Sequence, residues 1–304
     1  MSEDFEAGSN SPPAWLNSGR GLGPRLRWHF GTDGPLTALS LSRETGDLFV
    51  ADQAGTLYRL DRTGQIQAMT RLPSPAISMS WAEDGSQGAA IVDEETILRF
   101  DRNLQVLHKL SLPDVCLGVA VTPFGNHLAV ALSDGTNVIY NERKRRISRF
   151  ETIRPLTFLK FCTTEDVLFG AAEHGLLCCH NLAGAEIWQQ KNWANVGKLC
   201  CTGDGDLIYL ASFAHGIQTL DGDGAAIGSY VLEGTVNRLD VSYEPERLMA
   251  ATIERALFWL DSDGEMLWAT QLDDDVVDIC CDPLGEWAVC GLTERGVYRL
   301  DWGG

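Results

Sequence analysis

Residues 55–64 read GTLYRLDRTG, and the aspartate in this stretch, Asp61, has an equivalent every 40 residues along the chain. Each equivalent is Asp or Asn and ends an apolar run: Asp61, Asp101, Asn141, Asn181, Asp221, Asp261 and Asp301. Seven copies of one position indicate seven copies of one supersecondary unit. A period of about 40 residues is typical of β-propellers and of helical arrays, so the neighbouring positions must decide between strand and helix.

Upstream of each aspartate, apolar residues alternate with small or polar ones. An apolar residue lies twenty-two positions before the aspartate in every copy: Leu39, Met79, Val119, Leu159, Leu199, Leu239 and Ile279. A second apolar position follows two residues later, and this period of two indicates a half-buried strand. Two more runs precede the aspartate and a fourth follows it. We therefore predict an all-β fold, a seven-bladed β-propeller with four antiparallel strands in each blade.

The two ends of the chain predict how the ring closes. The last copy stops after its third strand, at Asp301. The missing fourth strand is found near the N-terminus, where Arg25–Phe30 (RLRWHF) falls on the same 40-residue phase. A strand that completes the last blade would hide two sheet edges. We expect a propeller over residues 25–304, preceded by a disordered acidic and polar leader over residues 1–24.

Composition narrows the classes of partner and compartment. A net charge of −18 argues against nucleic acid and anionic membranes, which are themselves negative. No apolar run reaches the roughly 20 residues that cross a bilayer. Nine cysteines without a secretory signal point to a reducing compartment, which we expect to be the cytoplasm of a bacterium or another cell. The charge favours either solubility alone or a protein partner with a basic or mixed docking segment.

The segments GTLYRLDRTG (55–64) and ALFWLDSDGEMLW (256–268) resemble the repeat of quinoprotein-type (PQQ-type) propellers, which runs Gly-x-Leu-Tyr-x-Leu-Asp-x-x-Thr-Gly with a Trp shortly after. Trp28, Trp188 and Trp268 match this docking Trp. WD-repeat propellers are a more distant likeness, because their Gly-His start and Trp-Asp ending are missing. The resemblance covers residues 25–302. It implies assembly scaffolds and partner-binding platforms for the most part, with a minority of secreted enzymes.

Neither a cofactor nor a metal is predicted. Quinone dehydrogenases related to this repeat are usually exported and some hold the cofactor under a disulfide between adjacent cysteines. The adjacent pairs here, Cys178-Cys179, Cys200-Cys201 and Cys280-Cys281, fall in strands, where neighbours point to opposite faces. We interpret them as small buried hydrophobic residues. No catalytic Ser-His-Asp or Cys-His constellation can be nominated from spacing.

The innermost strands, which line the channel, differ between the two parts of the ring. Blades one to three have small residues such as Ser40 and Ala120 between their apolar positions, whereas later blades have charges: Lys160, Lys198, Arg238, Asp240 and Asp278. Unpaired buried charges are costly. We therefore expect either ion pairs that link adjacent blades, or a polar channel mouth that receives a small anion or a side chain of a partner.

The loops should give the disc two different faces. One face gathers carboxylates, aromatic residues and histidines: Trp193, Phe213, His174, His215, Glu254, Asp273, Asp274, Asp275 and Glu294. Metal binding by the two histidines with Glu173, or calcium binding by the Asp run, lacks the ligand number or spacing of such sites, so solvated loops are the simpler interpretation. The other face receives the basic turn Arg143, Lys144, Arg145 and Arg146, either as a seat for an acidic partner or as a solvated turn.

These features predict a non-enzymatic interaction platform, a scaffold subunit of a larger assembly that docks a partner on its acidic loop face. Aromatic side chains inside a charged rim are typical of binding hot spots. The alternative is a small-molecule-binding sensor or enzyme that uses the central channel in a quinoprotein-like or lactonase-like manner.

Overall fold

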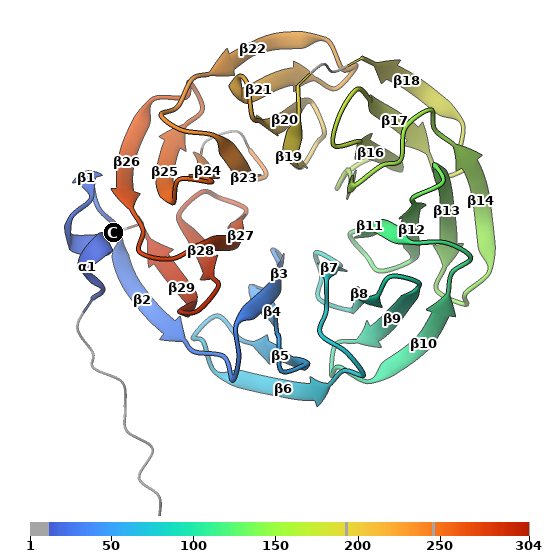
Figure 1. The fold of residues 1–304 in the computed structure, drawn as a ribbon, viewed down its shortest axis with the longest axis horizontal. Coiled ribbons are helices and arrows are strands. Elements are labelled where there is room, and N and C mark those ends of the chain that lie inside the picture. The colour runs from blue at the N-terminus through green and yellow to red at the C-terminus, as the bar shows by residue number, and fades with distance from the viewer. Residues whose placement is uncertain (1–11, 192–193, 245–246, 304) are drawn as a thin grey trace, which may run out of the picture.

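Seven antiparallel sheets follow one another around a central channel in the computed structural model, which describes residues 12–191, 194–244 and 247–303 (Figure 1). Each blade has four strands that run from the channel to the outer edge in the order of the chain, except that the outer strand of the last blade comes from the N-terminal part of the chain. The prediction of an all-β, seven-bladed propeller is therefore confirmed.

Blades one to four contain the first sixteen of these strands. Blade one consists of β3 (Leu36–Ser42), β4 (Asp47–Asp52), β5 (Thr56–Leu60) and β6 (Ile66–Arg71). Blade two consists of β7 (Ser78–Trp81), β8 (Gln87–Asp93), β9 (Thr96–Asp101) and β10 (Val106–Ser111). Blade three consists of β11 (Cys116–Val121), β12 (His127–Leu132), β13 (Thr136–Asn141) and β14 (Arg146–Glu151). Blade four consists of β15 (Phe158–Phe161), β16 (Val167–Ala171), β17 (Leu177–Asn181) and β18 (Glu186–Gln190).

The remaining blades complete the ring. Blade five consists of β19 (Val196–Cys201), β20 (Leu207–Ser212), β21 (Gly216–Asp221) and β22 (Ala226–Tyr230). Blade six consists of β23 (Val236–Val241), β24 (Arg247–Thr252), β25 (Ala256–Asp261) and β26 (Met266–Gln271). Blade seven consists of β27 (Val276–Cys281), β28 (Trp287–Leu292), β29 (Gly296–Asp301) and β2 (Arg25–Phe30).

The second strand of each blade shows where the core lies. Every residue of β4 is buried, whereas most of the outer strand β6 is exposed. The second strands are covered on both faces by the neighbouring blades, so most of their residues are apolar. Apolar clusters therefore form between consecutive blades, such as the one that stacks Trp81 on Phe49 with ring centroids 3.6 Å apart.

The repeated Asp or Asn has one structural role in six blades. Asp61 Oδ1 accepts hydrogen bonds from the N–H groups of Thr63 and Gln65, at 2.8 and 3.1 Å. The equivalents in blades two to six accept N–H donors of the same turn in the same way. These hydrogen bonds between an Asx side chain and the following backbone stabilise the turn in which the chain reverses direction. Asp301, at the end of the last repeat, instead accepts from Arg299 Nε at 2.8 Å.

The N-terminal strand closes the ring as predicted. β2 lies beside β29 with Leu26 opposite Leu300 and His29 opposite Tyr298. Trp28 then reaches the next blade, where its Nε1 donates to the backbone oxygen of Arg62 at 3.0 Å. Trp188 makes the equivalent bond to the oxygen of Gly222 at 2.8 Å. These indole contacts join the outer edge of one blade to the last turn of the following blade.

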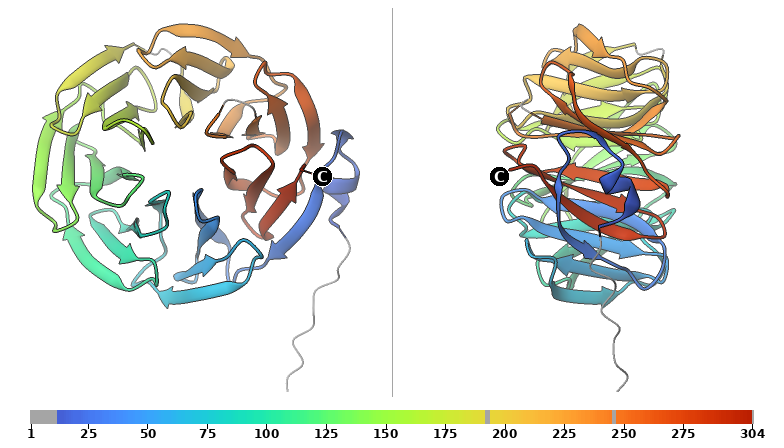
Figure 2. Two further views of the ribbon diagram at one scale, coloured as in Figure 1. Left: turned by 180° about the vertical axis from the view of Figure 1, so that it is seen from behind. Right: turned by 90° about the vertical axis from the view of Figure 1, so that its left-hand side faces the viewer.

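The chain before β2 differs from the prediction over residues 12–24. The short helix α1 (Ala14–Asn17) and the strand β1 (Arg20–Gly21) lie on the outside of the ring, where β1 adds a fifth strand to blade six beside β26 (Figures 1 and 2). Trp15 is only 4% exposed and packs edge-on against Tyr298. Burial of this large indole contributes to holding the segment against the ring. Residues 1–11 of the predicted leader lie outside the described residues.

Candidate functional site

The central channel is a cavity of about 770 Å³ lined by the first strands of the blades. Each first strand begins at one face of the disc and ends at the other. We call the face where these strands begin the mouth face; it also carries the loops between the second and third strands. The two sets of loops are in contact on this face. The N–H of Val196, at the start of β19, donates to the backbone oxygen of Glu173, in the loop between β16 and β17, at 2.9 Å. The opposite face, made by the other two sets of loops, is called the hairpin face.

Among the residues that the structure describes, three ion pairs cross the channel. Each joins two blades that have one blade between them on the shorter way around the ring. The pairs are Lys160 Nζ with Glu83 Oε1 at 3.0 Å, Lys198 Nζ with Asp278 Oδ2 at 2.5 Å, and Arg43 Nη2 with Asp240 Oδ1 at 2.7 Å. The expectation of ion pairs between adjacent blades is therefore wrong in its geometry. Side chains on the first strands point toward the axis, so long cationic side chains reach past the neighbouring blade.

The ion pairs near the hairpin face are deeply buried. Arg43 and Glu83 are each 5% exposed, and they follow the ends of β3 and β7. Burial alone raises the pKa of Glu83, but the cations of Lys160 and Arg43 lower it more, so this pKa lies below its ordinary value of 4.5. Burial alone lowers the pKa of Lys160, and Glu83 raises it above 10.5. All of these groups are thus held in their charged forms at neutral pH.

Arg43 and Glu83 were missed in the sequence. They occupy the same position of consecutive repeats, just beyond the first strand. The equivalents in the other repeats are uncharged: Pro123, Thr163, Gly203, Tyr243 and Pro283. Two opposite charges at a position that is otherwise neutral are the signal that could have identified them.

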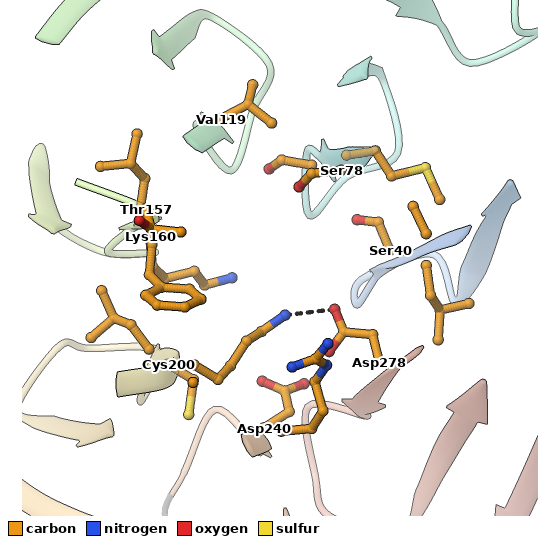
Figure 3. A pocket seen from close by; sticks show the side chains of 18 of the residues that line it. Ser40, Ser78, Val119, Thr157, Lys160, Cys200, Asp240 and Asp278 are labelled. Atoms are coloured by element: carbon orange, nitrogen blue, oxygen red, sulfur yellow. Dashed lines mark hydrogen bonds and ion pairs between the residues drawn. The ribbon is translucent and has the colours of Figure 1, made fainter. Parts of the chain in front are cut away.

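The other side of the channel is built from small and apolar residues. Figure 3 shows Ser40 across the opening from Lys160, Ser78 across from Asp240, and Val119 across from Asp278. Two serines here join consecutive blades: Ser40 Oγ accepts the N–H of Trp81 at 3.1 Å, and Ser80 Oγ accepts that of Val121 at 3.0 Å. The predicted asymmetry between the two parts of the channel wall is therefore present in the structure.

Arg238 differs from the other channel cations. Its Nε donates to the backbone oxygen of Val277 at 2.6 Å, and its Nη1 donates to the oxygen of Asn237 at 2.9 Å. It forms no ion pair with any residue that the structure describes. The side chain is half-buried and lines the cavity. All five residues predicted for the channel cluster thus line one cavity, with four of them in ion pairs and Arg238 held by carbonyl groups alone.

The mouth face receives the predicted loop residues. Glu173, His174 and Phe213 line the cavity at its opening, and Phe213 is 41% exposed. His174 Nδ1 lies 3.1 Å from Asn195 Oδ1. His215 is exposed on the same face but does not line the cavity. Trp193 lies outside the described residues.

The acidic residues of this face are largely engaged within the protein. Asp274 is buried and its Oδ2 accepts the N–H groups of Glu294 and Arg295 at 2.7 and 3.1 Å. Asp273 pairs with Arg295 at 3.0 Å and Asp275 with Arg255 at 2.7 Å. Glu254 accepts the N–H of Thr235 at 2.7 Å. By contrast, the side chains of Glu173 and Glu294 form no hydrogen bond or ion pair with the described residues.

The predicted basic turn lies on the hairpin face. Arg143, Lys144, Arg145 and Arg146 are all exposed. The Nζ of Lys144 donates to the Lys109 oxygen at 2.6 Å, and Arg143 lies 3.8 Å from Glu142. These contacts are the weak interactions of a solvated turn.

The cysteines are buried throughout and none is in a disulfide. Burial raises the pKa of the thiols of Cys178 and Cys179 to about 12. Among residues 12–191, 194–244 and 247–303, no three His, Cys, Asp or Glu side chains gather closely enough to hold a metal ion. No helix in the described part of the chain is both long and apolar enough to span a bilayer.

Comparison with known proteins gives no assignment for this chain, because no protein-family model and no curated protein matches it.

Proposed function

We propose that this protein is a non-enzymatic platform that docks a partner protein on its mouth face. The observation that carries the proposal is the exposure of apolar side chains on the mouth face. Phe213 is 41% exposed and Ile77 is 58% exposed, and both line the cavity. Ile253 and Val231, on loops of the same face, are 52% and 85% exposed. Apolar anchors inside a charged rim are what a partner's hot-spot residues need.

The charges of the mouth face select the partner's chemistry. Asp273 and Asp275 are neutralised by arginines, whereas Glu173 and Glu294 keep their carboxylates free of cations in the described structure. A docking segment with an apolar anchor flanked by basic residues would meet both features. Such a rim mainly raises the association rate, and its effect weakens with salt.

The channel wall supports a binding role over a catalytic one. Burial lowers the pKa of Lys198, but Asp278 raises it above 10.5. The pKa of Lys160 is likewise raised by its ion-pair partner, and the pKa of Glu83 is lowered by its cations. A general acid or base works best with a pKa near the operating pH. These shifts leave the three side chains charged and unsuited to proton transfer at neutral pH.

The repeat itself is best assigned to the quinoprotein type within the propellers. The Nε1 atoms of Trp28 and Trp188 both donate to the last turn of the next blade, which is the docking expected of that repeat. A cytoplasmic location is our further expectation, because nine buried thiols suit a reducing compartment.

Site-specific photo-crosslinking tests the proposed face. A benzophenone side chain replaces Phe213 on the mouth face or, in the control, Phe124, which is 59% exposed beside the end of a first strand on the hairpin face. In cells of the native source we expect one discrete adduct from position 213 and none from position 124. A Glu173→Lys change should weaken the adduct, and so should higher salt when the irradiation is repeated in a lysate. Adducts from position 124 alone, or from neither position, would refute the proposal.

A further inference from the structure

We propose that the central channel binds a small organic acid, with its carboxylate held by Arg238 and Lys198 and its apolar part against the opposite wall. The cavity of about 770 Å³ lies within the range of roughly 300 to 1,000 Å³ that small-molecule sites occupy. It opens at the mouth face. Toward the hairpin face, its lining ends at the buried ion-paired side chains of Arg43 and Glu83.

Arg238 and Lys198 have more hydrogen-bond donors than the described residues accept. A guanidinium has five N–H donors, and Arg238 uses its Nε and Nη1 on two backbone oxygens. Its Nη2 has no acceptor among the described residues. Lys198 has three donors, of which one goes to Asp278. The two backbone contacts also fix the guanidinium plane, so the remaining N–H groups are already positioned for a ligand.

The ion pairs of the channel wall leave Arg238 without a carboxylate partner. Among the described residues, the cations of the wall are Arg43, Lys160, Lys198 and Arg238, and its carboxylates are Glu83, Glu173, Asp240 and Asp278. Three carboxylates compensate three cations in the ion pairs across the channel. The two charges that remain, Glu173 at the opening of the channel and Arg238 on β23, form no ion pair with each other or with another described residue. Because a carboxylate matches the planar fork of arginine, it is the anion that best fits Arg238.

An apolar wall faces these charges across the channel. Ile77, Leu117, Val119 and Phe158 line the same cavity on blades two to four. Figure 3 shows Val119 across the channel from Asp240 and Asp278. A fully hydrated inorganic anion would leave this wall in contact with water. An acid with a hydrocarbon part would cover it, which adds favourable burial of apolar surface.

Calorimetric titration with hexanoate tests the proposal, with neutral hexanamide as the matched probe. We expect saturable binding of hexanoate at one site and no binding of hexanamide. Arg238→Gln should weaken hexanoate binding by at least about tenfold, because a charge-assisted contact is lost. Arg71→Gln, which alters an exposed arginine outside the channel, should leave the affinity unchanged.

A second variant distinguishes loss of the site from misfolding, because it should raise the affinity for hexanoate instead of lowering it. Asp278→Asn removes a carboxylate and frees Lys198, so hexanoate should bind several-fold more tightly. A capped peptide with one glutamate distinguishes a free acid from a partner's acidic side chain as the source. Binding of either carboxylate that is lost in Arg238→Gln supports the proposal and identifies its source. Binding of neither, equal binding of hexanamide, or unchanged affinity in Arg238→Gln would overturn it.

Discussion

Ser80 in blade two and Asp240 in blade six occupy the same position of the repeat, yet Asp240 makes an interaction that Ser80 does not. Ser80 Oγ accepts the N–H of Val121 at 3.0 Å, and Asp240 Oδ2 accepts the N–H of Cys281 at 2.8 Å, in each case from the following blade. Only Asp240 also binds a cation, Arg43 of blade one. A neutral hydroxyl therefore suffices to join neighbouring blades, and the charge is an addition.

This comparison separates the scaffold from the candidate site. Buried ion pairs contribute little net stability, because desolvation offsets much of their attraction. Blades one to three join their neighbours without charges at these strand positions, so the charged residues of blades four to seven are not required by the fold. We infer that they are present for the chemistry of the channel.

The largest effect is expected from Asp240→Ala. The change leaves Arg43 buried without its carboxylate partner, which typically costs about 3 to 5 kcal/mol in the free energy of unfolding. Chemical denaturation of the variant and the native protein measures it. A loss of about 1 kcal/mol, as for a neutral hydrogen bond, would show that the blade-six position differs little from blade two.

A double variant sharpens the same point. Arg43→Met with Asp240→Ser removes the ion pair and installs the serine found at the equivalent position of blades one and two. Because both charges disappear together, the free energy of unfolding should recover to within about 1.5 kcal/mol of the native value. If the double variant is as unstable as Asp240→Ala, the pair is structurally required and the separation of scaffold from site is wrong.

Lowering the pH should reduce the stability that Glu83 and its cations contribute. The pKa of Glu83 lies below 4.5 in the folded protein because Lys160 and Arg43 overcome the opposite effect of burial. The stability from this lowered pKa is present above about 4.5 and is lost as the pH falls through the folded value. The difference in unfolding free energy between native protein and Glu83→Gln should therefore be large at pH 7 and shrink toward pH 3. An unchanged difference over that range would contradict the assigned pKa direction.

A smaller loss of stability is expected in the uncharged part of the channel wall. Ser80→Ala removes one hydrogen bond to the N–H of Val121 and should cost about 1 kcal/mol, measured by the same denaturation. Arg145→Gln in the exposed basic turn serves as the outer control and should change stability by less than about 0.5 kcal/mol. A Ser80→Ala loss as large as that of Asp240→Ala would remove the contrast between the two positions.

Most of the fold could be predicted because its signals are local. The Asx turns at Asp61 and its equivalents depend on residues within four positions, and the alternation in each strand depends on the next residue. The closing strand Arg25–Phe30 was also predictable, since it keeps the phase of the repeat. Trp15 was not, because its burial depends on a pocket formed by blades six and seven.

The sequence identified most of the charged residues that line the candidate site, but not which residues form ion pairs with each other. Lys160, Lys198, Arg238, Asp240 and Asp278 were identified because they break a column of small residues. Their partners depend on the curvature of the ring, which brings Arg43 to Asp240 across 197 residues of sequence. A 40-residue period specifies equivalent positions, but it does not say which blades a long side chain can reach.

Anomalous diffraction from crystals soaked in a brominated organic acid, such as 6-bromohexanoate, tests the central claim most directly. The account predicts one strong bromine peak inside the channel against the wall of blades two to four, with the carboxylate density beside Arg238. A channel without a peak while bromine appears at the basic turn of residues 143–146, or no ordered bromine at all, would contradict it.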